Sequence, residues 1–422
     1  LAHLLGGSVK SHKKEYGKAT LNVCSESPLL AEIPKESQVW MSHGDAVVDL
    51  PKGFTTIAKS GEVNAAMENT DANIYGVQFH PEVSHSLYGE QILSNFLFNI
   101  CGCVVDWTMD SYMNDKITEI KAIVGDKKVV LGLSGGVDSS VAAMLIHRAI
   151  GENLMCVFVD TGLLRLNECA QVQETYAPFG LNISYINAGA QFFKALSGVA
   201  EPEAKRKIIG HEFITVFNNT IGNLKDVDFL AQGTIYPDII ESSSSSGVSK
   251  VIKSHHNVGG LPEDMKLQLL EPLKYLFKDE VRRLGKLLGL PENLINRHPF
   301  PGPGLGIRVV GEVVAEKVAI LQQADSIFLE ELRKEDLYNK VSQAFAVLLP
   351  VKSVGVMGDN RSYEWTAVLR SVSTIDFMTA EVSRIPFEVL ERVALRIVNE
   401  VAGINRVLYD FTSKPPATIE WE

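Results

Sequence analysis

The sequence lacks a basic surplus, paired cysteines and any long apolar run, and each absence excludes a class of protein. It carries 40 Lys and Arg against 51 Asp and Glu, a net charge of -11, which argues against a general nucleic-acid binder. Its five cysteines are scattered and odd in number, which favours a reducing, cytoplasmic compartment over a disulfide framework. No apolar run approaches the roughly 20 residues of a membrane span. We therefore expect neither nucleic acid nor a membrane as a partner.

The most informative absence is that of a lysine in a glycine-rich loop. Residues 131–145 read LGLSGGVDSSVAAML, a strand pattern, a Gly-Gly turn and a helix pattern. Glycine lets the backbone approach an anion, and the N–H groups of a helix start attract phosphate. The common nucleotide loop adds a lysine that cradles the β and γ phosphates during transfer. Here Asp138 stands among hydroxyls instead, which predicts a loop that grips an intact pyrophosphate with Mg²⁺ held by Asp138.

The pattern around this loop predicts an α/β protein, and its 422 residues indicate about three domains. Strand patterns alternate with helix patterns, which is typical of a doubly wound parallel sheet with its ligand at the carboxyl ends of the strands. These strand patterns lie at 129–133, 155–159, 183–186 and 228–231. The earlier part of the chain has strand patterns at 39–41, 54–58 and 73–79 and helix patterns at 87–100 and 106–126.

Two segments between the patterned regions break the regularity. Residues 297–306, RHPFPGPGLG, hold three prolines and three glycines and mark a domain boundary, beyond which 307–422 read as an α+β unit. The run Ser242–Ser246, followed by Gly247, is typical of either a plain surface linker or a mobile segment.

The loop Ser134–Ser140 resembles the signature of the N-type ATP pyrophosphatases, which cleave ATP between its α and β phosphates. Four further segments resemble the glutamine-hydrolysing GMP synthetase family. They are QGTIYPDIIES (232–242), IKSHHNVGGLP (252–262), RHPFPGPGLGIR (297–308) and SKPPATIEWE (413–422). This resemblance implies a partial class I glutamine amidotransferase domain at 1–105. It implies an ATP pyrophosphatase domain of the adenine nucleotide alpha hydrolase type at 106–300, and an α+β dimerisation domain at 301–422.

The resemblance also implies a reaction. ATP would adenylylate the 2-oxo oxygen of xanthosine monophosphate (XMP) and release pyrophosphate, and ammonia derived from glutamine would then displace AMP to give GMP. The intermediate must be kept from water, which calls for a lid. Residues 234–261 match the lid segment of the family, and the serine run lies inside it, which favours the mobile segment over the linker. The family works as a homodimer with Mg²⁺.

Site residues are carried over from the matching motifs. The ATP or pyrophosphate loop would consist of Ser134, Gly135, Gly136, Val137, Asp138, Ser139 and Ser140. The magnesium ligands would be Asp138, Asp238 and Glu241, and the residues beside the α-phosphate Lys253, His255 and His256. XMP would be held by Arg206, Gln343, Arg406, Lys414, Ile419 and Glu420.

The N-terminal part resembles the end of a class I amidotransferase domain at YGVQFHPE (75–82). Because positions i and i+2 of a strand face one side, Glu82 would orient His80 as general base. The cysteine nucleophile should lie in a Gly-x-Cys-x-Gly elbow, and none of the five cysteines does. Since the elbow of the family precedes a segment that looks like Leu1–Gly7, we expect a truncated chain that uses free ammonia and not glutamine.

Two other functions remain open from the residues alone. The first is an AMP-forming enzyme with another acceptor, such as a tRNA base, against which the acidic net charge and the terminal motif both weigh. The second is an inactive fragment that only binds nucleotides or dimerises. Production of AMP together with GMP, and without ADP, discriminates among the three.

Overall fold

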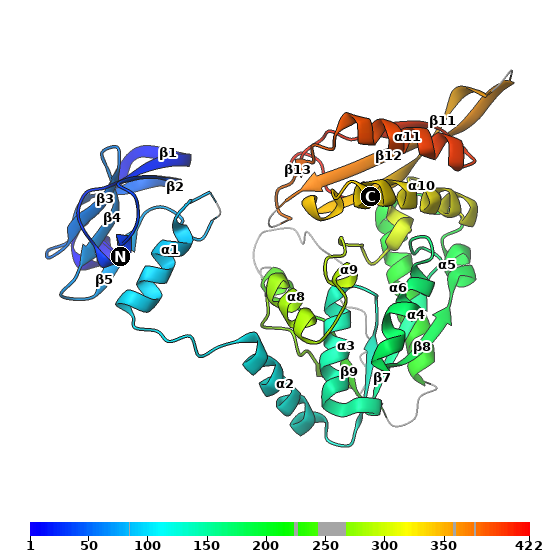
Figure 1. The fold of residues 1–422 in the computed structure, drawn as a ribbon, viewed down its shortest axis with the longest axis horizontal. Coiled ribbons are helices and arrows are strands. Elements are labelled where there is room, and N and C mark those ends of the chain that lie inside the picture. The colour runs from blue at the N-terminus through cyan, green and yellow to red at the C-terminus, as the bar shows by residue number, and fades with distance from the viewer. Residues whose placement is uncertain (84, 223–226, 244–266, 358–359, 375–376) are drawn as a thin grey trace. The chain divides into compact units, whose positions relative to one another are not determined.

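The computed structural model describes residues 1–83, 85–222, 227–243, 267–357, 360–374 and 377–422 (Figure 1). The chain divides into two compact units, Leu1–Thr108 and Met109–Glu422. Among the described residues, no helix combines the length and the apolar character that crossing a membrane requires.

The first unit is an antiparallel sheet whose described strands lie in the order β2-β1-β3-β4-β5. Its strands are β1 (Ser8–Val23), β2 (Glu36–Asp49), β3 (Thr55–Ser60), β4 (Val63–Asn69) and β5 (Ile74–Val77). The core on one face contains Leu21, Met41, Ile57 and Phe79, all nearly inaccessible to solvent. The helix α1 (Gly89–Ser94) continues as the π-helical turn η3 (Asn95–Ile100).

The predicted strands 39–41, 54–58 and 73–79 overlap β2, β3 and β5, whereas β1 and β4 were not predicted, and two further details differ. The strand predicted at 73–79 ends at Val77, so His80 and Glu82 lie in the following loop and not on the strand. Beyond Val77 the His80 N–H donates to the Trp40 carbonyl of β2 at 3.0 Å, so the chain leaves β4 at this point. The helix pattern 87–100 starts at Gly89, where a Cβ atom would lie 1.8 Å from the Pro81 carbonyl oxygen, so only glycine permits this approach.

The second unit begins with a parallel sheet, which confirms the doubly wound fold class. Its described strands lie in the order β10-β9-β6-β7-β8. They are β6 (Lys128–Gly132), β7 (Leu154–Asp160), β8 (Asn182–Asn187), β9 (Val227–Ala231) and β10 (Gln268–Leu270). The helices of this part are α2 (Met109–Val124), α3 (Val137–Ile150), α4 (Glu168–Tyr176), α5 (Gly189–Ala195), α6 (Pro202–Gly222), α7 (Tyr236–Ser243), α8 (Lys278–Leu287) and α9 (Glu292–Ile295).

Because side chains alternate along each strand, the two faces of this sheet pack into two different cores. Val129 and Leu131 of β6 point into the core formed with α2, α3 and α8. Val130, between them, joins the opposite core, which includes residues of α5 and α6. Because side chains of a strand alternate between faces, an uninterrupted apolar run becomes a strand buried on both sides.

The last part of the chain is an α+β layer that shares a core with the parallel sheet. It consists of α10 (Ala315–Lys334), β11 (Gln343–Met357), β12 (Asn360–Ser373), β13 (Glu381–Val382), α11 (Phe387–Glu400) and β14 (Ile404–Tyr409). Strand β12 pairs antiparallel with β11 and β13 and parallel with β14. The core of α5 and α6 extends without a break into Leu305, Val309 and Leu321, so the predicted boundary at 300/301 crosses continuous packing.

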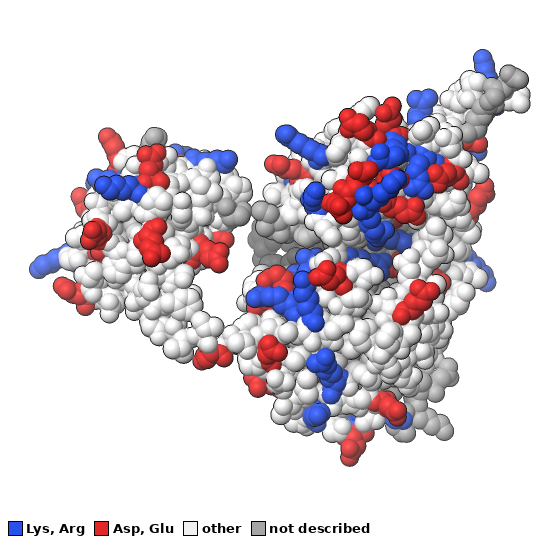
Figure 2. All heavy atoms as spheres, in the orientation of Figure 1, with Lys and Arg blue, Asp and Glu red and all other residues white. Residues whose placement is uncertain are grey.

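Charges of both signs mingle over α10 and α11 on the face that Figure 2 shows. The buried carboxylate of Glu331 accepts hydrogen bonds from the guanidinium groups of Arg392 at 2.6 Å and Arg396 at 3.0 Å. The hydrogen bond from Arg392 is the main cause that lowers the pKa of the Glu331 carboxyl, and the bond from Arg396 adds to it. Burial alone would raise this pKa. This network joins the two helices of the layer.

His298, in the proline- and glycine-rich segment, predicts a pH dependence of stability. Its ring stacks on Tyr338 with centroids 3.8 Å apart, and burial lowers its pKa from 6.5 to about 4. The unfolded chain binds this proton below pH 6.5, whereas the folded chain does so only near 4. We therefore expect the free energy of unfolding to fall by about 3 kcal/mol as the pH is lowered from 6.5 to 4. Urea unfolding of wild type and His298→Asn across this range measures it, and parallel pH profiles would contradict it.

Candidate active site

The predicted phosphate loop, Ser134–Ser140, follows the carboxyl end of β6, where the sequence places it. Gly135 has a φ of 73°, in the left-handed region, and Gly136 is the N-cap of α3. The Ser134 backbone N–H donates to the Ser139 hydroxyl at 3.2 Å, and that hydroxyl lies 3.1 Å from the Gly136 carbonyl. The fully buried Ser140 hydroxyl donates to the same carbonyl and meets the Tyr176 hydroxyl. These contacts fix the shape of the loop from within.

Asp138 lies at the start of α3 and is paired with a lysine from a distant part of the chain. The Lys278 ammonium is 2.6 Å from Asp138 Oδ2, and the two residues are 140 positions apart. Lys278 is the first residue of α8, whose N-terminus is fixed by a 2.8 Å hydrogen bond from the Phe277 N–H to Glu280. The cation that the loop sequence lacks is therefore supplied by another helix.

The other oxygen of Asp138 is an unused acceptor. Asp138 Oδ1 is buried and has no hydrogen-bond partner among the residues that the structure describes. A buried carboxylate oxygen without a donor is costly unless a ligand or cation satisfies it. Gly233, after β9, approaches the same turn so closely that a Cβ atom would lie 3.1 Å from the Ser139 nitrogen.

Arg297 supports the loop from the outside. Its guanidinium donates to the Gly135 carbonyl at 3.2 Å and to the buried Glu168 carboxylate. Glu168 also accepts the Arg165 backbone N–H at 2.8 Å at the start of α4. The proline- and glycine-rich segment thus begins at the phosphate loop.

Residues predicted for the lid are only partly described. Asp238 lies in the first turn of α7, and its carboxylate accepts the Ile235 N–H at 3.0 Å. Glu241 belongs to the same helix, but its side chain lies outside what the structure describes, as do Lys253, His255 and His256. Among the described residues, no group of three or more His, Cys, Asp or Glu side chains is arranged to hold a metal ion.

Four of the six residues predicted for XMP converge on the segment 418–422. Gln343 donates to Glu420 Oε1 at 2.6 Å, and Arg206 donates to the Glu422 backbone carbonyl. The Ile419 carbonyl accepts from the buried Arg370 at 3.3 Å. The two others lie apart from these contacts, since Lys414 donates to the Phe377 carbonyl at 2.8 Å and Arg406 is an exposed residue of β14.

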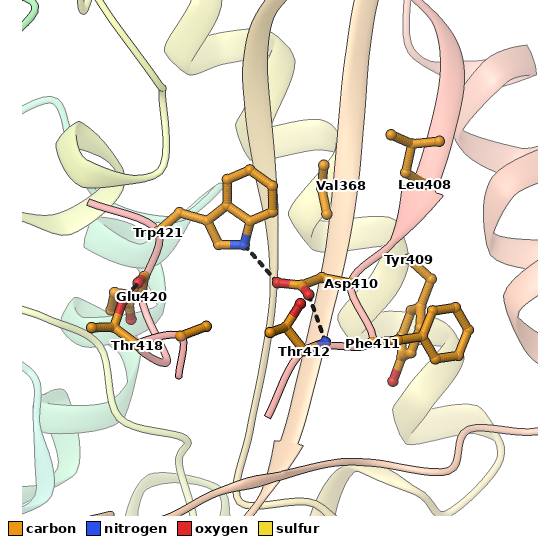
Figure 3. A pocket seen from close by; sticks show the side chains of 10 residues that line it. Val368, Leu408, Tyr409, Asp410, Phe411, Thr412, Thr418, Glu420 and Trp421 are labelled. Carbon is orange, nitrogen blue, oxygen red and sulfur yellow. Dashed lines mark hydrogen bonds between the residues drawn. The ribbon is translucent and has the colours of Figure 1, made fainter. Parts of the chain in front are cut away.

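A cavity of about 510 Å³ opens beside the same segment (Figure 3). In Figure 3 the Trp421 indole points toward Asp410, to which it donates at 3.0 Å. Its walls are Val368, Leu408, Tyr409, Asp410, Phe411, Thr412, Ala417, Thr418, Glu420 and Trp421. Aromatic and polar side chains thus share the lining of this cavity.

His80 and Glu82 of the first unit form the predicted pair. His80 Nδ1 is 2.8 Å from Glu82 Oε1, and both side chains are substantially exposed. A hydrogen bond from its own backbone N–H is the main cause that lowers the pKa of the Glu82 carboxyl, and the His80 ring lowers it further. Partial burial acts in the opposite direction. The Trp40 carbonyl accepts the His80 N–H at 3.0 Å, which holds the loop against β2.

Sequence reasoning missed Lys278 and Arg308 as site residues. Arg308 donates from Nε and Nη2 to the two oxygens of Glu420, at 3.0 and 2.8 Å. A signal existed for Lys278, because a cation in the first turn of a helix opposes the helix dipole and therefore needs a separate reason. No comparable local signal marked Arg308.

The fold and the candidate site together indicate a class of protein. A lysine-free phosphate loop at the carboxyl edge of a parallel sheet, with a His–Glu pair in a separate unit, indicates an ATP pyrophosphatase joined to an amidotransferase domain. Residues 1–100 match the family "Glutamine amidotransferase class-I", 109–208 match "NAD synthase" and 330–421 match "GMP synthase C terminal domain".

Full-length relatives specify the family. The chain is 59% identical to "GMP synthase [glutamine-hydrolyzing]" of Fusobacterium nucleatum subsp. nucleatum, over 100% of this chain and 83% of that protein. It is 58% identical to the protein of the same name from Idiomarina loihiensis, with the same coverage. The chain therefore belongs to the family of glutamine-hydrolysing GMP synthases. A solved NH3-dependent NAD synthetase from Campylobacter jejuni is 17% identical over 55% of this chain and 85% of that one, with a TM-score of 0.35.

Proposed function

We propose that this chain converts XMP to GMP with ATP, through an adenylyl-XMP intermediate, and releases AMP and pyrophosphate. The observation that carries the proposal is the lysine-free phosphate loop in a chain that is 59% identical to a GMP synthase over its whole length. The 2-oxo oxygen of XMP attacks the α-phosphorus of ATP, and the bond to the β-phosphate breaks. Ammonia then attacks C2, and AMP leaves with that oxygen.

The phosphate loop suits this cleavage because it holds a leaving group and not a transferred phosphate. Residues Ser134–Ser140 would hold the β and γ phosphates, with their charge shared by Lys278 and Asp138-bound Mg²⁺. The pairing of Lys278 with Asp138 at 2.6 Å supports this division, since it brings the cation to the loop from α8. The α-phosphate would face outward, toward Lys253, His255 and His256 of the lid.

The unused Asp138 oxygen fits a magnesium ion. Carboxylate oxygens are ligands that Mg²⁺ prefers, and the ion usually keeps waters and phosphate oxygens as its other ligands. Asp138 would hold it, with Asp238 and Glu241 as further ligands. When bound, the ion neutralises charge that develops on the departing pyrophosphate.

XMP would lie at the segment 418–422, held by the six residues carried over from the family motifs. Glu420 supports this proposal because it lines the cavity while Gln343 and Arg308 hold its carboxylate. The exposed position of Arg406 is compatible with a phosphate contact, since a free guanidinium binds phosphate with paired hydrogen bonds.

We propose that a protein consisting of residues 1–422 uses free ammonia, and not glutamine, as its nitrogen donor. His80 and Glu82 supply a base and its orienting carboxylate, but none of the five cysteines lies in a nucleophile elbow. We expect GMP formation with ammonium and less than about 1% of that rate with glutamine, because removing the nucleophile of such a triad lowers kcat by several orders of magnitude. Parallel assays with each nitrogen donor measure this, and equal rates would contradict it.

The remaining proposals concern assembly and location. We propose the functional division 1–105, 106–300 and 301–422, with a homodimer formed through the last part. The exposed side chains of Val354, Val356 and Tyr363 on the β11–β12 hairpin support such a contact. The described cysteines are all free thiols, which supports a reducing cytoplasm.

The products of the reaction test the proposed function. The chain, incubated with XMP, ATP, Mg²⁺ and ammonium, should form AMP and GMP in equal amounts without ADP. ADP as the product would contradict cleavage between the α and β phosphates. AMP formed with a tRNA acceptor, and not with XMP, would favour the alternative acceptor.

A further inference from the structure

The segment RHPFPGPGLGIR touches the phosphate loop through Arg297, and its last residue, Arg308, holds the Glu420 carboxylate. Its end is fastened on two sides. The Leu305 N–H donates to the Leu163 carbonyl at 2.8 Å, and a Cβ atom on Gly304 would lie 2.3 Å from that same oxygen. The Arg308 carbonyl accepts the Leu348 N–H of β11 at 2.8 Å. The backbone around Arg308 is thus tied both to the loop after β7 and to β11.

The Arg308 side chain is fully buried and fixed in orientation. Its guanidinium lies 4.0 Å from the ring centroid of Phe345 and 5.1 Å from that of Phe300. A buried guanidinium requires a carboxylate partner, and two parallel hydrogen bonds fix the plane of that partner. Glu420, 112 positions later, is the partner in this fork.

Glu420 is left with unequal oxygens. Oε1 accepts from Arg308 and from Gln343, at 2.8 and 2.6 Å, whereas Oε2 accepts from Arg308 Nε at 3.0 Å. An ionised carboxylate oxygen has two lone pairs, so one donor leaves acceptor capacity on Oε2. Glu420 also lines the cavity, and 17% of its side chain is exposed, which leaves room for a donor on a bound molecule beside the carboxylate that Arg308 holds.

We propose that Arg308 is a positioning residue that keeps the Glu420 carboxylate aimed as a hydrogen-bond acceptor for an N–H or hydroxyl donor of the acceptor nucleotide. This inference rests on the proposed function, because it assumes that XMP binds beside Glu420. Arg308 itself does not touch the reacting atoms. Its effect on the reaction should therefore pass through Glu420 alone.

A double-mutant cycle on XMP binding tests this dependence. Arg308→Met and Glu420→Gln should each raise the KM for XMP by about 10- to 100-fold, because a charge-assisted hydrogen bond is lost or misdirected. The KM for ATP should stay within about twofold in both, since the phosphate loop is unchanged. In the Glu420→Gln background, Arg308→Met should change the KM for XMP by less than about threefold. A further rise of about tenfold in the double variant would overturn the proposal.

The double variant and a control substitution distinguish a failure to fold from a loss of the positioning role. If Arg308→Met alone does not fold, the double variant removes both charges, and its comparison with Glu420→Gln decides the question by the same criterion. Arg392→Met is the matched control, since it also deletes an arginine paired with a buried carboxylate, Glu331, but away from the cavity. It should leave the KM for XMP unchanged, and an equal rise there would also overturn the proposal.

The cycle distinguishes this inference from the proposed function. If the wild-type chain forms no AMP with XMP, the proposed function fails, and the positioning role with it. If the wild type forms AMP and GMP while the two substitutions act additively, only the positioning role fails.

Discussion

Asp138→Asn is expected to lower XMP-dependent AMP formation by about a thousandfold or more, because it removes the charge that a magnesium ion and Lys278 share at the loop. Asparagine has nearly the same shape, so α3 and the loop should fold unchanged. The KM for XMP should stay close to the wild-type value, since the nucleotide is proposed to bind at the other side of the active site. Initial rates at saturating XMP, with ATP and Mg²⁺ varied, measure the effect.

The matched control for this prediction is Asp228→Asn. Asp228 is a half-exposed residue near the amino end of β9, 3.8 Å from the Lys127 ammonium, whereas ligands of such sheets bind at the carboxyl ends. Its substitution should leave the rate within about twofold, as expected of an exposed ion pair. An Asp138→Asn enzyme as active as this control would contradict the role of Asp138.

Lys278→Met is expected to lower kcat/KM for ATP by about a hundredfold, which corresponds to the loss of one charge-assisted contact to the phosphates. The substitution keeps the aliphatic length of the side chain, so packing at the start of α8 should persist. The effect should appear with ATP as the varied substrate and be absent from the KM for XMP. Steady-state kinetics with each substrate varied in turn measure both.

Lys286→Met is the corresponding control on the same helix. Lys286 lies in the last turn of α8, 3.5 Å from Glu292, and more than half of its side chain is exposed. Its substitution should change neither KM. If Lys278→Met behaved in the same way, the lysine would only neutralise Asp138 and would not serve the phosphates.

The sequence predicted most of what depends on local pattern. The strand–loop–helix around Asp138 was found at its correct place because glycines, hydroxyls and apolar runs act within a few residues. The parallel sheet followed from the alternation of strands and helices. The pair of His80 with Glu82 was also expected, but on a strand that ends at Val77, because an apolar pattern does not show where the pairing of a strand stops.

Contacts between segments that are distant in the sequence could not be predicted from local sequence patterns. Lys278 meets Asp138 across 140 positions, and Arg308 meets Glu420 across 112, so neither pair has a periodicity or spacing to detect. Both depend on which edge of the sheet a later helix or loop reaches. Ser140 illustrates the same limit, because the contact of its buried hydroxyl with Tyr176, 36 positions away, has no local signal in the sequence.

The most direct test of the central claim follows one oxygen atom. XMP carrying heavy oxygen at its 2-oxo position is converted with ATP and ammonium, and the products are separated and weighed by mass spectrometry. Adenylylation of XMP predicts that the label appears in the phosphate of AMP, with one heavy oxygen for each GMP formed. Label in pyrophosphate, in inorganic phosphate or in water, with none in AMP, would contradict the adenylyl-XMP intermediate.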